Sequence, residues 1–368
     1  MVYLDYNATT PVLPEALEAF RRAATEAFGN PGSGHAAGRR AREVLEEARR
    51  QVADLLGAQP EEIIFVSGGT EANNLALMGV ALSRGSGHIL VSRIEHPSVL
   101  EPALRLLEQG FSVDFLPVDG QGYVDPEEVR RRLKPETILV SVMLANNETG
   151  ALQPVAEIAR ICREAGVLFH TDAAQAVGKI PVSVSLGVDL LTLAGHKMYA
   201  PKGIGALYVR RGIALSRIMH GAGQERGLRP GTEPVPLCAA LGAAAEFALL
   251  DLPAEAERQK ALREYLWEGL QEIEPQVVRH GDPDRTLPNT LSVAFPGRAA
   301  SEILSRAEGL CASTGAACHD RRKALSHVLS AMGVPPELAQ GTIRFSLGRF
   351  TTREDLDRAL DLLNEALR

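Results

Sequence analysis

Short apolar runs alternate with helical patterns from about residue 60 to residue 210. The apolar runs lie at 63–66, 88–92, 113–116, 138–143 and 167–171, and helical periodicity predicts helices at about 70–83, from 97, at 126–133 and at 154–165. Strand–helix alternation of this kind predicts a parallel sheet with right-handed crossovers. The run 138–143 is nearly all apolar, as expected for a strand that is covered on both faces. Ligands of such sheets bind at the carboxyl ends of the strands.

The pattern changes after an apolar, alanine-rich helix that is expected at about 235–250. The segment 251–254, Asp-Leu-Pro-Ala, predicts a boundary. It is followed by a long amphipathic helix, a strand at 290–295, a helix near 299–307, a strand at 343–347 and a closing helix from about 353. We therefore expect a large domain at 15–250. A small α+β domain should combine residues 1–14 with residues 251–368.

Composition and charge argue against several classes of function. The chain has 368 residues, 45% hydrophobic and 23% charged, with a formal net charge of −7. This charge argues against a nucleic-acid-binding protein, and no apolar run reaches the roughly 18 residues that a membrane helix needs. The N-terminus lacks the pattern of a signal peptide. The four cysteines, at 162, 238, 311 and 318, show no metal-ligand spacing, so we expect no metal and a cytoplasmic location.

Candidate chemistry begins with Lys197, which follows the apolar end of a strand in Ala194-Gly195-His196-Lys197. Burial at such a position lowers the pKa of an amine and makes it nucleophilic. Asp172 ends another apolar run 25 residues earlier. An amine that forms a Schiff base with an aldehyde and a carboxylate that keeps a ring nitrogen protonated can together hold pyridoxal 5′-phosphate (PLP).

Other segments supply parts of the same kind of site. Gly69 and Thr70 lie in a glycine turn that leads from a strand into a helix, where backbone N–H groups favour an anion such as a phosphate. His96 follows a strand and precedes a proline, so its imidazole can stack on a ring or relay protons. Either Asn147 or Gln175 could bond the phenolic oxygen of a pyridine ring.

Cys318 lies among small residues in Ser313-Thr314-Gly315-Ala316-Ala317-Cys318-His319. A thiol in such a segment can act as a nucleophile when a histidine or a cofactor helps to ionise it. The other three cysteines are expected to pack in the core or against a strand.

Taken together, these motifs resemble those of the cysteine desulfurases, class-V enzymes of the PLP-dependent transferase fold type I. The resemblance extends from Tyr3–Pro11 to Arg344–Thr352 and includes the segments 67–74, 95–96, 145–150, 170–175, 195–197 and 224–232. It implies an α/β fold in which a large domain, with a mainly parallel seven-stranded sheet, is joined to a small α+β domain carrying the catalytic cysteine.

The resemblance also implies a role for each residue. Lys197 should hold PLP and move protons at the substrate Cα, His96 should stack on the ring, and Asp172 should pair with the ring nitrogen. Gln175 should bond the phenolic oxygen, Asn147 should lie against cofactor and substrate, and Arg344 should bind the substrate carboxylate. Cys318 should take the sulfur. Gly69, Thr70 and His196 should bind the phosphate, with Thr232 reaching in from the second subunit of a homodimer. Ala194 and Gly195 should also contact the cofactor.

Two features depart from the common pattern. Many relatives have serine where this chain has Ala194, so one hydroxyl to the phosphate is missing. The segment 315–319 is more similar to selenocysteine lyases, although the 25 residues between Cys318 and Arg344 match long-loop desulfurases.

The resemblance implies conversion of L-cysteine to L-alanine. The sulfur would pass from a Cys318 persulfide to an acceptor, either an iron–sulfur scaffold or a tRNA-thiolation protein. The alternatives are a selenocysteine lyase, a plain class-V aminotransferase, which needs no such thiol, and a catalytically idle docking subunit.

Overall fold

The computed structural model describes residues 1–314 and 325–368. Its largest sheet has seven strands, in the order β2 (Ile63–Val66), β8 (Gly205–Val209), β7 (Leu190–Ala194), β6 (Leu168–Asp172), β5 (Thr137–Ser141), β3 (His88–Ser92) and β4 (Ser112–Leu116). Strand β8 is antiparallel to both β2 and β7, and the remaining pairs are parallel. The expected mainly parallel seven-stranded sheet is confirmed, although the sequence pattern did not single out β8.

Strands β2, β7 and β8 are buried on both faces, which explains why they are nearly all apolar, whereas the edge strand β4 is only partly buried. Along β2, Ile63 and Phe65 belong to one apolar cluster, whereas Ile64 and Val66 belong to another on the opposite face. Helices α3 (Gly69–Arg84) and α4 (Pro97–Glu108) contribute to the second cluster. Helices α2 (Ala36–Leu56), α6 (Val155–Glu164) and α7 (Val235–Ile273) contribute to the first. The short helix α5 (Pro126–Arg132) packs beside α6.

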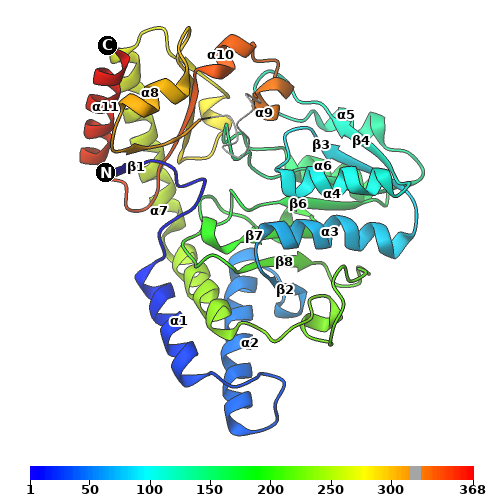
Figure 1. Cartoon of the computed structure of the whole chain (residues 1–368). Helices are drawn as coiled ribbons and strands as arrows, with labels where there is room; N and C mark the ends of the chain where they lie inside the picture. Colours follow the sequence, from blue (N-terminus) through cyan, green and yellow to red (C-terminus); the bar gives the residue numbers. More distant parts are fainter. Residues whose placement is uncertain (315–324) are drawn as a thin grey trace.

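A second apolar core lies away from this sheet, in the part of Figure 1 that holds both chain termini. Its four-stranded sheet has the order β12 (Ser313–Thr314), β13 (Thr342–Ser346), β10 (Thr290–Ala294) and β9 (Val278–Arg279). Strand β1 (Val2–Tyr3) pairs with β11 (Leu310–Cys311), which joins the N-terminal segment to this part. Helices α8 (Ala300–Arg306) and α11 (Arg353–Leu367) contribute to this core. Helices α9 (His327–Ala331) and α10 (Pro336–Gln340) instead contribute to a smaller apolar cluster with Ile94 and Met143. The proposed domain limits remain a prediction.

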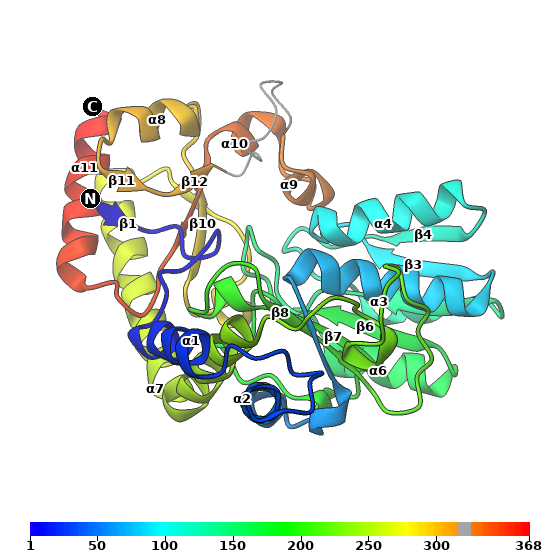
Figure 2. The ribbon, with the colours of Figure 1, turned by 60° about the horizontal axis from the view of Figure 1, so that its bottom comes forward.

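The predicted break between two helices at 251–254 was wrong, because α7 runs without interruption from Val235 to Ile273 with Pro253 inside it. A proline leaves one helical carbonyl without its N–H partner. The neighbouring residues Leu249 and Leu250 are 51% and 80% exposed, so solvent can satisfy that carbonyl. Figures 1 and 2 show α7 passing from the region of α1 (Pro14–Glu26) and α2 to that of α11.

Helix α7 has the length and apolar composition of a membrane-spanning segment, and it is the one such helix among residues 1–314 and 325–368. Half of its apolar stretch is buried inside the protein, where it packs against α1 and α2. The protein core therefore accounts for much of its apolar surface.

Candidate active site

A cavity of about 420 Å³ lies where the carboxyl ends of the parallel strands meet the second core. It brings together ten of the residues that sequence reasoning had selected: Gly69, Thr70, His96, Asn147, Asp172, Gln175, Ala194, His196, Lys197 and Arg344. Gly195 is buried between Ala194 and His196 but is not part of the wall. Thr232 is exposed and lies outside the cavity of its own chain. Cys318 lies outside the described residues.

Lys197 ends a single 3₁₀ turn, Gly195–Lys197, that follows directly from β7. Its Nζ donates hydrogen bonds to the carbonyl oxygens of Asn7 and Ala8, at 2.6 and 2.8 Å. Burial lowers the pKa of Lys197 to about 8, and the positive charge of Arg344 contributes to the decrease. About a tenth of this amine is therefore unprotonated at pH 7, far more than for an ordinary lysine, and the unprotonated form is the nucleophile.

Asp172 is the last residue of β6 and is 6% exposed. Its Oδ2 accepts a hydrogen bond from Nδ2 of Asn73 at 2.7 Å, and its Oδ1 accepts one from the backbone N–H of Ala174 at 2.9 Å. These two donors fix the plane of the carboxylate. A fixed, buried carboxylate at the cavity wall is suited to pairing with a protonated ring nitrogen.

His96 is the N-cap residue of α4, and its extended backbone fits a position before a proline. Its Nδ1 accepts a hydrogen bond from the backbone N–H of Ser98 at 3.1 Å. The ring proton of the neutral imidazole is thus placed on Nε2. Burial lowers the pKa of His96, so the ring is neutral near pH 7. A neutral ring held at one edge can lie flat against an aromatic cofactor.

The start of α3 forms an anion-binding end of the cavity. Gly69 and Thr70 begin this 16-residue helix, and the first N–H groups of a helix lack intrahelical acceptors. The glycine at Gly205 allows the turn to pack tightly, because an added Cβ would lie 2.8 Å from Cα of Gly68. His196 completes this end, and burial lowers its pKa to about 4. A neutral His196 can donate a hydrogen bond to a phosphate oxygen.

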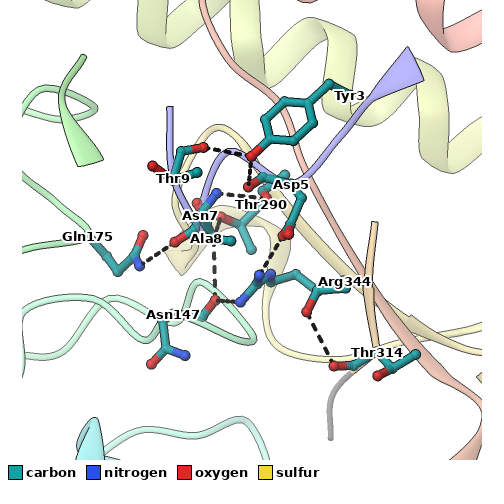
Figure 3. A network of polar contacts seen from close by, with 12 residues as sticks. Tyr3, Asp5, Asn7, Ala8, Thr9, Asn147, Gln175, Thr290, Thr314 and Arg344 are labelled. Carbon is teal, nitrogen blue, oxygen red and sulfur yellow. Dashed lines mark hydrogen bonds and ion pairs between the residues drawn. The ribbon is translucent and has the colours of Figure 1, made fainter. Parts of the chain in front are cut away.

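Arg344 enters from β13, on the side of the second core. Its guanidinium donates to the carbonyl oxygen of Asn147 at 2.8 Å and forms an ion pair with Asp5 at 2.7 Å (Figure 3). Its Nε is buried and has no hydrogen-bond partner among the described residues. The side chain is therefore held in place with unused donor capacity, which fits the binding of a carboxylate.

The N-terminal segment closes the cavity, and sequence reasoning missed the role of Asn7 there. Asn7 is 1% exposed, and its carbonyl oxygen accepts hydrogen bonds from Lys197 and from Nε2 of Gln175, the latter at 3.0 Å. Its Nδ2 donates to Oγ1 of Thr290 at 2.9 Å (Figure 3). Asn7 falls within Tyr3–Pro11, a motif that supported the resemblance. Membership of this motif was the one sequence signal that could have identified Asn7 as a site residue.

Asn73, Ser98 and Lys179 were also missed as parts of the site. Asn73 bonds both Asp172 and Oγ of Ser98, and both Asn73 and Ser98 lie at the cavity wall. Asn73 falls within the selected motif 67–74, whereas nothing in the local sequence distinguishes Lys179 from a solvated lysine.

The residues on both sides of the undescribed segment contact the site. Ser313 pairs with Arg344 in the β12–β13 ladder. Ser326 donates its hydroxyl proton to the carboxylate of Glu148, which follows Asn147. His327 lies 2.9 Å, through Nε2, from the carbonyl oxygen of Glu95, which precedes His96.

The residues present fit PLP as a cofactor. An amine with a lowered pKa, a fixed carboxylate and a helix start that favours anions face one cavity, and these three groups match the aldehyde, ring nitrogen and phosphate of the molecule. No group of three or more histidine, cysteine, aspartate or glutamate side chains suited to a metal is found among residues 1–314 and 325–368.

Comparison with curated proteins shows extensive similarity. The chain is 46% identical to a cysteine desulfurase IscS of Dictyoglomus turgidum, over 100% of this chain and 94% of that protein. It is 45% identical to a cysteine desulfurase IscS of Methanosarcina thermophila, over 99% of this chain and 91% of that protein.

Solved structures agree with these sequence relatives. A NifS-like protein superimposes with a TM-score of 0.94 at 40% identity, covering 100% of this chain and 99% of that chain. The structure of SspA in complex with cysteine superimposes with a TM-score of 0.86 at 36% identity, covering 96% of this chain and 100% of that chain. The expected fold type I architecture is thereby confirmed.

The family model for aminotransferase class-V matches residues 2–359, and this family depends on PLP in general. The family assignment made from the motifs is therefore confirmed: the chain belongs to the class-V aminotransferases.

Proposed function

We propose that this chain is a cysteine desulfurase, a PLP-dependent enzyme that removes sulfur from L-cysteine and releases L-alanine. The observation that carries the proposal is that Lys197 and Asp172 face one cavity, with the pKa of the amine lowered to about 8. Relatives at 43–46% identity named cysteine desulfurase support it.

Each part of the cofactor can be assigned to residues at the cavity. Lys197 would bind the aldehyde carbon, Asp172 the ring nitrogen and Gln175 the phenolic oxygen. His96 would lie against the ring, with Asn147 beside cofactor and substrate. Gly69, Thr70 and His196 would bind the phosphate at the start of α3, and Gly195 would support this end from behind the cavity wall. When bound, PLP supplies an electron-withdrawing ring that stabilises negative charge at the substrate Cα.

The chain's own residues would perform the remaining work. Arg344 binds the substrate carboxylate and so orients the substrate. Lys197 removes the proton at Cα and later returns one, and His96 moves protons nearby. Cys318 thiolate attacks the substrate sulfur, so an S–S bond forms as the C–S bond breaks. The electron pair of the C–S bond stays with carbon, which takes up a proton to become alanine.

The proposed placement of Cys318 is supported by the described residues on either side of it. Thr314 is four residues before Cys318, and four residues of extended chain reach about 14 Å at most. Ser313 pairs with Arg344 at the cavity, and Ser326 contacts Glu148 next to Asn147. The described residues on both sides of the segment therefore lie at the site.

The persulfide would pass to a sulfur-acceptor protein, either an iron–sulfur scaffold or a tRNA-thiolation protein. We further propose a cytoplasmic homodimer in which Thr232 binds the phosphate in the partner's cavity. The exposure of Thr232 outside its own cavity supports this arrangement. The division into domains at 15–250 and at 1–14 with 251–368 belongs to the same proposal.

Selenocysteine lyase is the second candidate, because the sequence Gly315–His319 is similar to that of such enzymes. A lyase would release selenium from selenocysteine faster than it releases sulfur from cysteine. Comparing turnover of the two amino acids separates these functions. A plain aminotransferase would instead transfer an amino group without releasing sulfide.

The test uses the purified protein with PLP, L-cysteine and a thiol reductant. Cys318→Ala should keep the visible absorbance of bound PLP and lose alanine formation from cysteine. Cys311→Ala is the matched control, because Cys311 lies in β11 outside the cavity, and it should retain activity. Full activity of Cys318→Ala would refute the nucleophile, and a colourless wild-type protein would refute the function.

A further inference from the structure

A second lysine, Lys179, is buried beside the cavity and has no part in the chemistry proposed above. It is 6% exposed, and it follows Gln175 by four residues in the turns after β6. Its Nζ donates hydrogen bonds to Oε1 of Gln175 at 2.8 Å and to Oδ1 of Asn7 at 2.9 Å. It is not part of the cavity wall, and its hydrogen bonds reach the site through these two residues.

The hydrogen bonds of Lys179 determine how two side-chain amides are oriented. Oε1 of Gln175 accepts a hydrogen bond from Lys179, so the N–H₂ group is the donor end of this amide. One N–H donates to the carbonyl oxygen of Asn7, and the second N–H is available for another acceptor. Oδ1 of Asn7 accepts from both Lys179 and Asn289, the latter at 3.0 Å, which leaves its Nδ2 to donate to Thr290. Neither amide can turn over without losing these bonds.

The charge state of Lys179 fits its surroundings. Burial lowers its pKa well below that of a free lysine, and the nearby charges of Lys197 and Arg344 lower it further. A neutral amine has two N–H bonds, and Lys179 has two acceptors among the described residues. The lowered pKa favours the neutral amine, which satisfies both acceptors without adding a third positive charge beside Lys197 and Arg344.

We propose that Lys179 is a positioning residue of the cofactor site. It holds the N–H₂ group of Gln175 toward the ring oxygen of bound PLP, and it fixes Asn7, whose carbonyl oxygen receives Lys197. This inference rests on the proposed function, since it assigns Gln175 to the ring oxygen.

A double-mutant cycle tests the inference, with Lys179→Met, Gln175→Leu and the combined variant. Each apoprotein is titrated with PLP, and the pH midpoint of the visible absorbance band is measured in each PLP-bound protein. Lys179→Met should weaken PLP binding about 3- to 10-fold, the effect of one lost hydrogen bond. It should also raise the pH midpoint, because the ring oxygen loses the N–H that stabilises its negative charge.

Gln175→Leu should shift the midpoint in the same direction, and the combined variant should shift it no further than the larger single change. Lys260→Met, at an exposed position of α7, is the matched control and should match the wild type. A wild-type midpoint in Lys179→Met, or shifts that add in the combined variant, would overturn the inference.

Should Lys179→Met fail to fold, Lys179→Gln is judged by the same criteria. Its side chain is one bond shorter and cannot bridge both acceptors, so an unshifted midpoint again overturns the inference. A wild-type protein without any visible band contradicts the proposed function instead. A wild-type band with an unaffected Lys179→Met contradicts this inference alone.

Discussion

Nζ of Lys197 lies 2.6 Å from the carbonyl oxygen of Asn7, although the two residues are 190 positions apart in the sequence. The N-terminal segment therefore supplies the acceptor that holds the amine before any aldehyde arrives. An unprotonated amine still has N–H bonds for this contact, so the contact is compatible with a nucleophilic state.

The lowered pKa of Lys197 predicts a pH dependence for the capture of PLP by the apoprotein. Below pH 8 the unprotonated fraction of the amine rises about tenfold for each pH unit, and it approaches completeness above that value. The rate constant of PLP capture should rise with pH and level off above about pH 8. Stopped-flow absorbance measures this rate, and a midpoint near 10.5, the ordinary value for lysine, would contradict the prediction.

Two neighbouring charges should move that midpoint in opposite directions. Asp172 raises the pKa of Lys197 and Arg344 lowers it. Asp172→Asn should therefore shift the midpoint of PLP capture below pH 8, and Arg344→Met should shift it above pH 8. An unshifted midpoint in both variants would show that burial alone sets the pKa, and shifts of the same sign would contradict the prediction.

Asn73→Ala should destabilise the protein and weaken PLP binding, because it removes the donor to the buried carboxylate of Asp172. Loss of one such bond costs about 1–3 kcal/mol. Chemical denaturation of the apoprotein measures the loss in the free energy of unfolding. Asn74→Ala is the matched control, since Asn74 bonds the backbone of Thr70 at the surface and should cost much less.

Ala194→Ser should tighten PLP binding. Ala194 lies at the cavity wall, and an added Cβ on Gly69 would lie 3.4 Å from the Cβ of Ala194. A serine hydroxyl there would reach the anion-binding start of α3 and add one hydrogen bond, which is worth about 3- to 10-fold in affinity. Equilibrium titration of the apoprotein measures this change. Ala165→Ser, at the exposed end of α6, should leave the affinity unchanged.

Arg344→Lys should raise KM for L-cysteine about 10-fold or more, because an ammonium group cannot form two parallel bonds to a carboxylate. Steady-state kinetics of alanine formation measure the effect. Arg349→Lys is the matched control: Arg349 is also largely buried, but it pairs with Asp251 outside the cavity. Equal effects of the two changes would argue against a substrate-binding role for Arg344.

Much of the large sheet could be predicted from local sequence patterns. A strand buried on both faces is largely apolar, so runs such as 63–66 and 89–91 stand out without any knowledge of their partners. The residues that follow such runs, including Asp172 and Lys197, were expected to meet because the carboxyl ends of parallel strands share one edge.

The connections between distant segments could not be read in this way. The antiparallel direction of β8 and the continuity of α7 through Pro253 depend on packing and solvent exposure, which local composition does not specify. The hydrogen bonds of Asn7 to residues of β10 and of the turns after β6 and β7 join segments that meet only after folding.

Local sequence patterns were sufficient to identify the residues that could bear the chemistry and the strands that would present them. Tertiary structure decided how those residues are held, as the case of Lys179 shows. A lysine in a turn is ordinarily solvated, and only the complete fold encloses this one with two amide oxygens as its partners. The physical reason is that burial, and with it the pKa and hydrogen bonding of a side chain, is set by every segment packed around it and not by its neighbours in sequence.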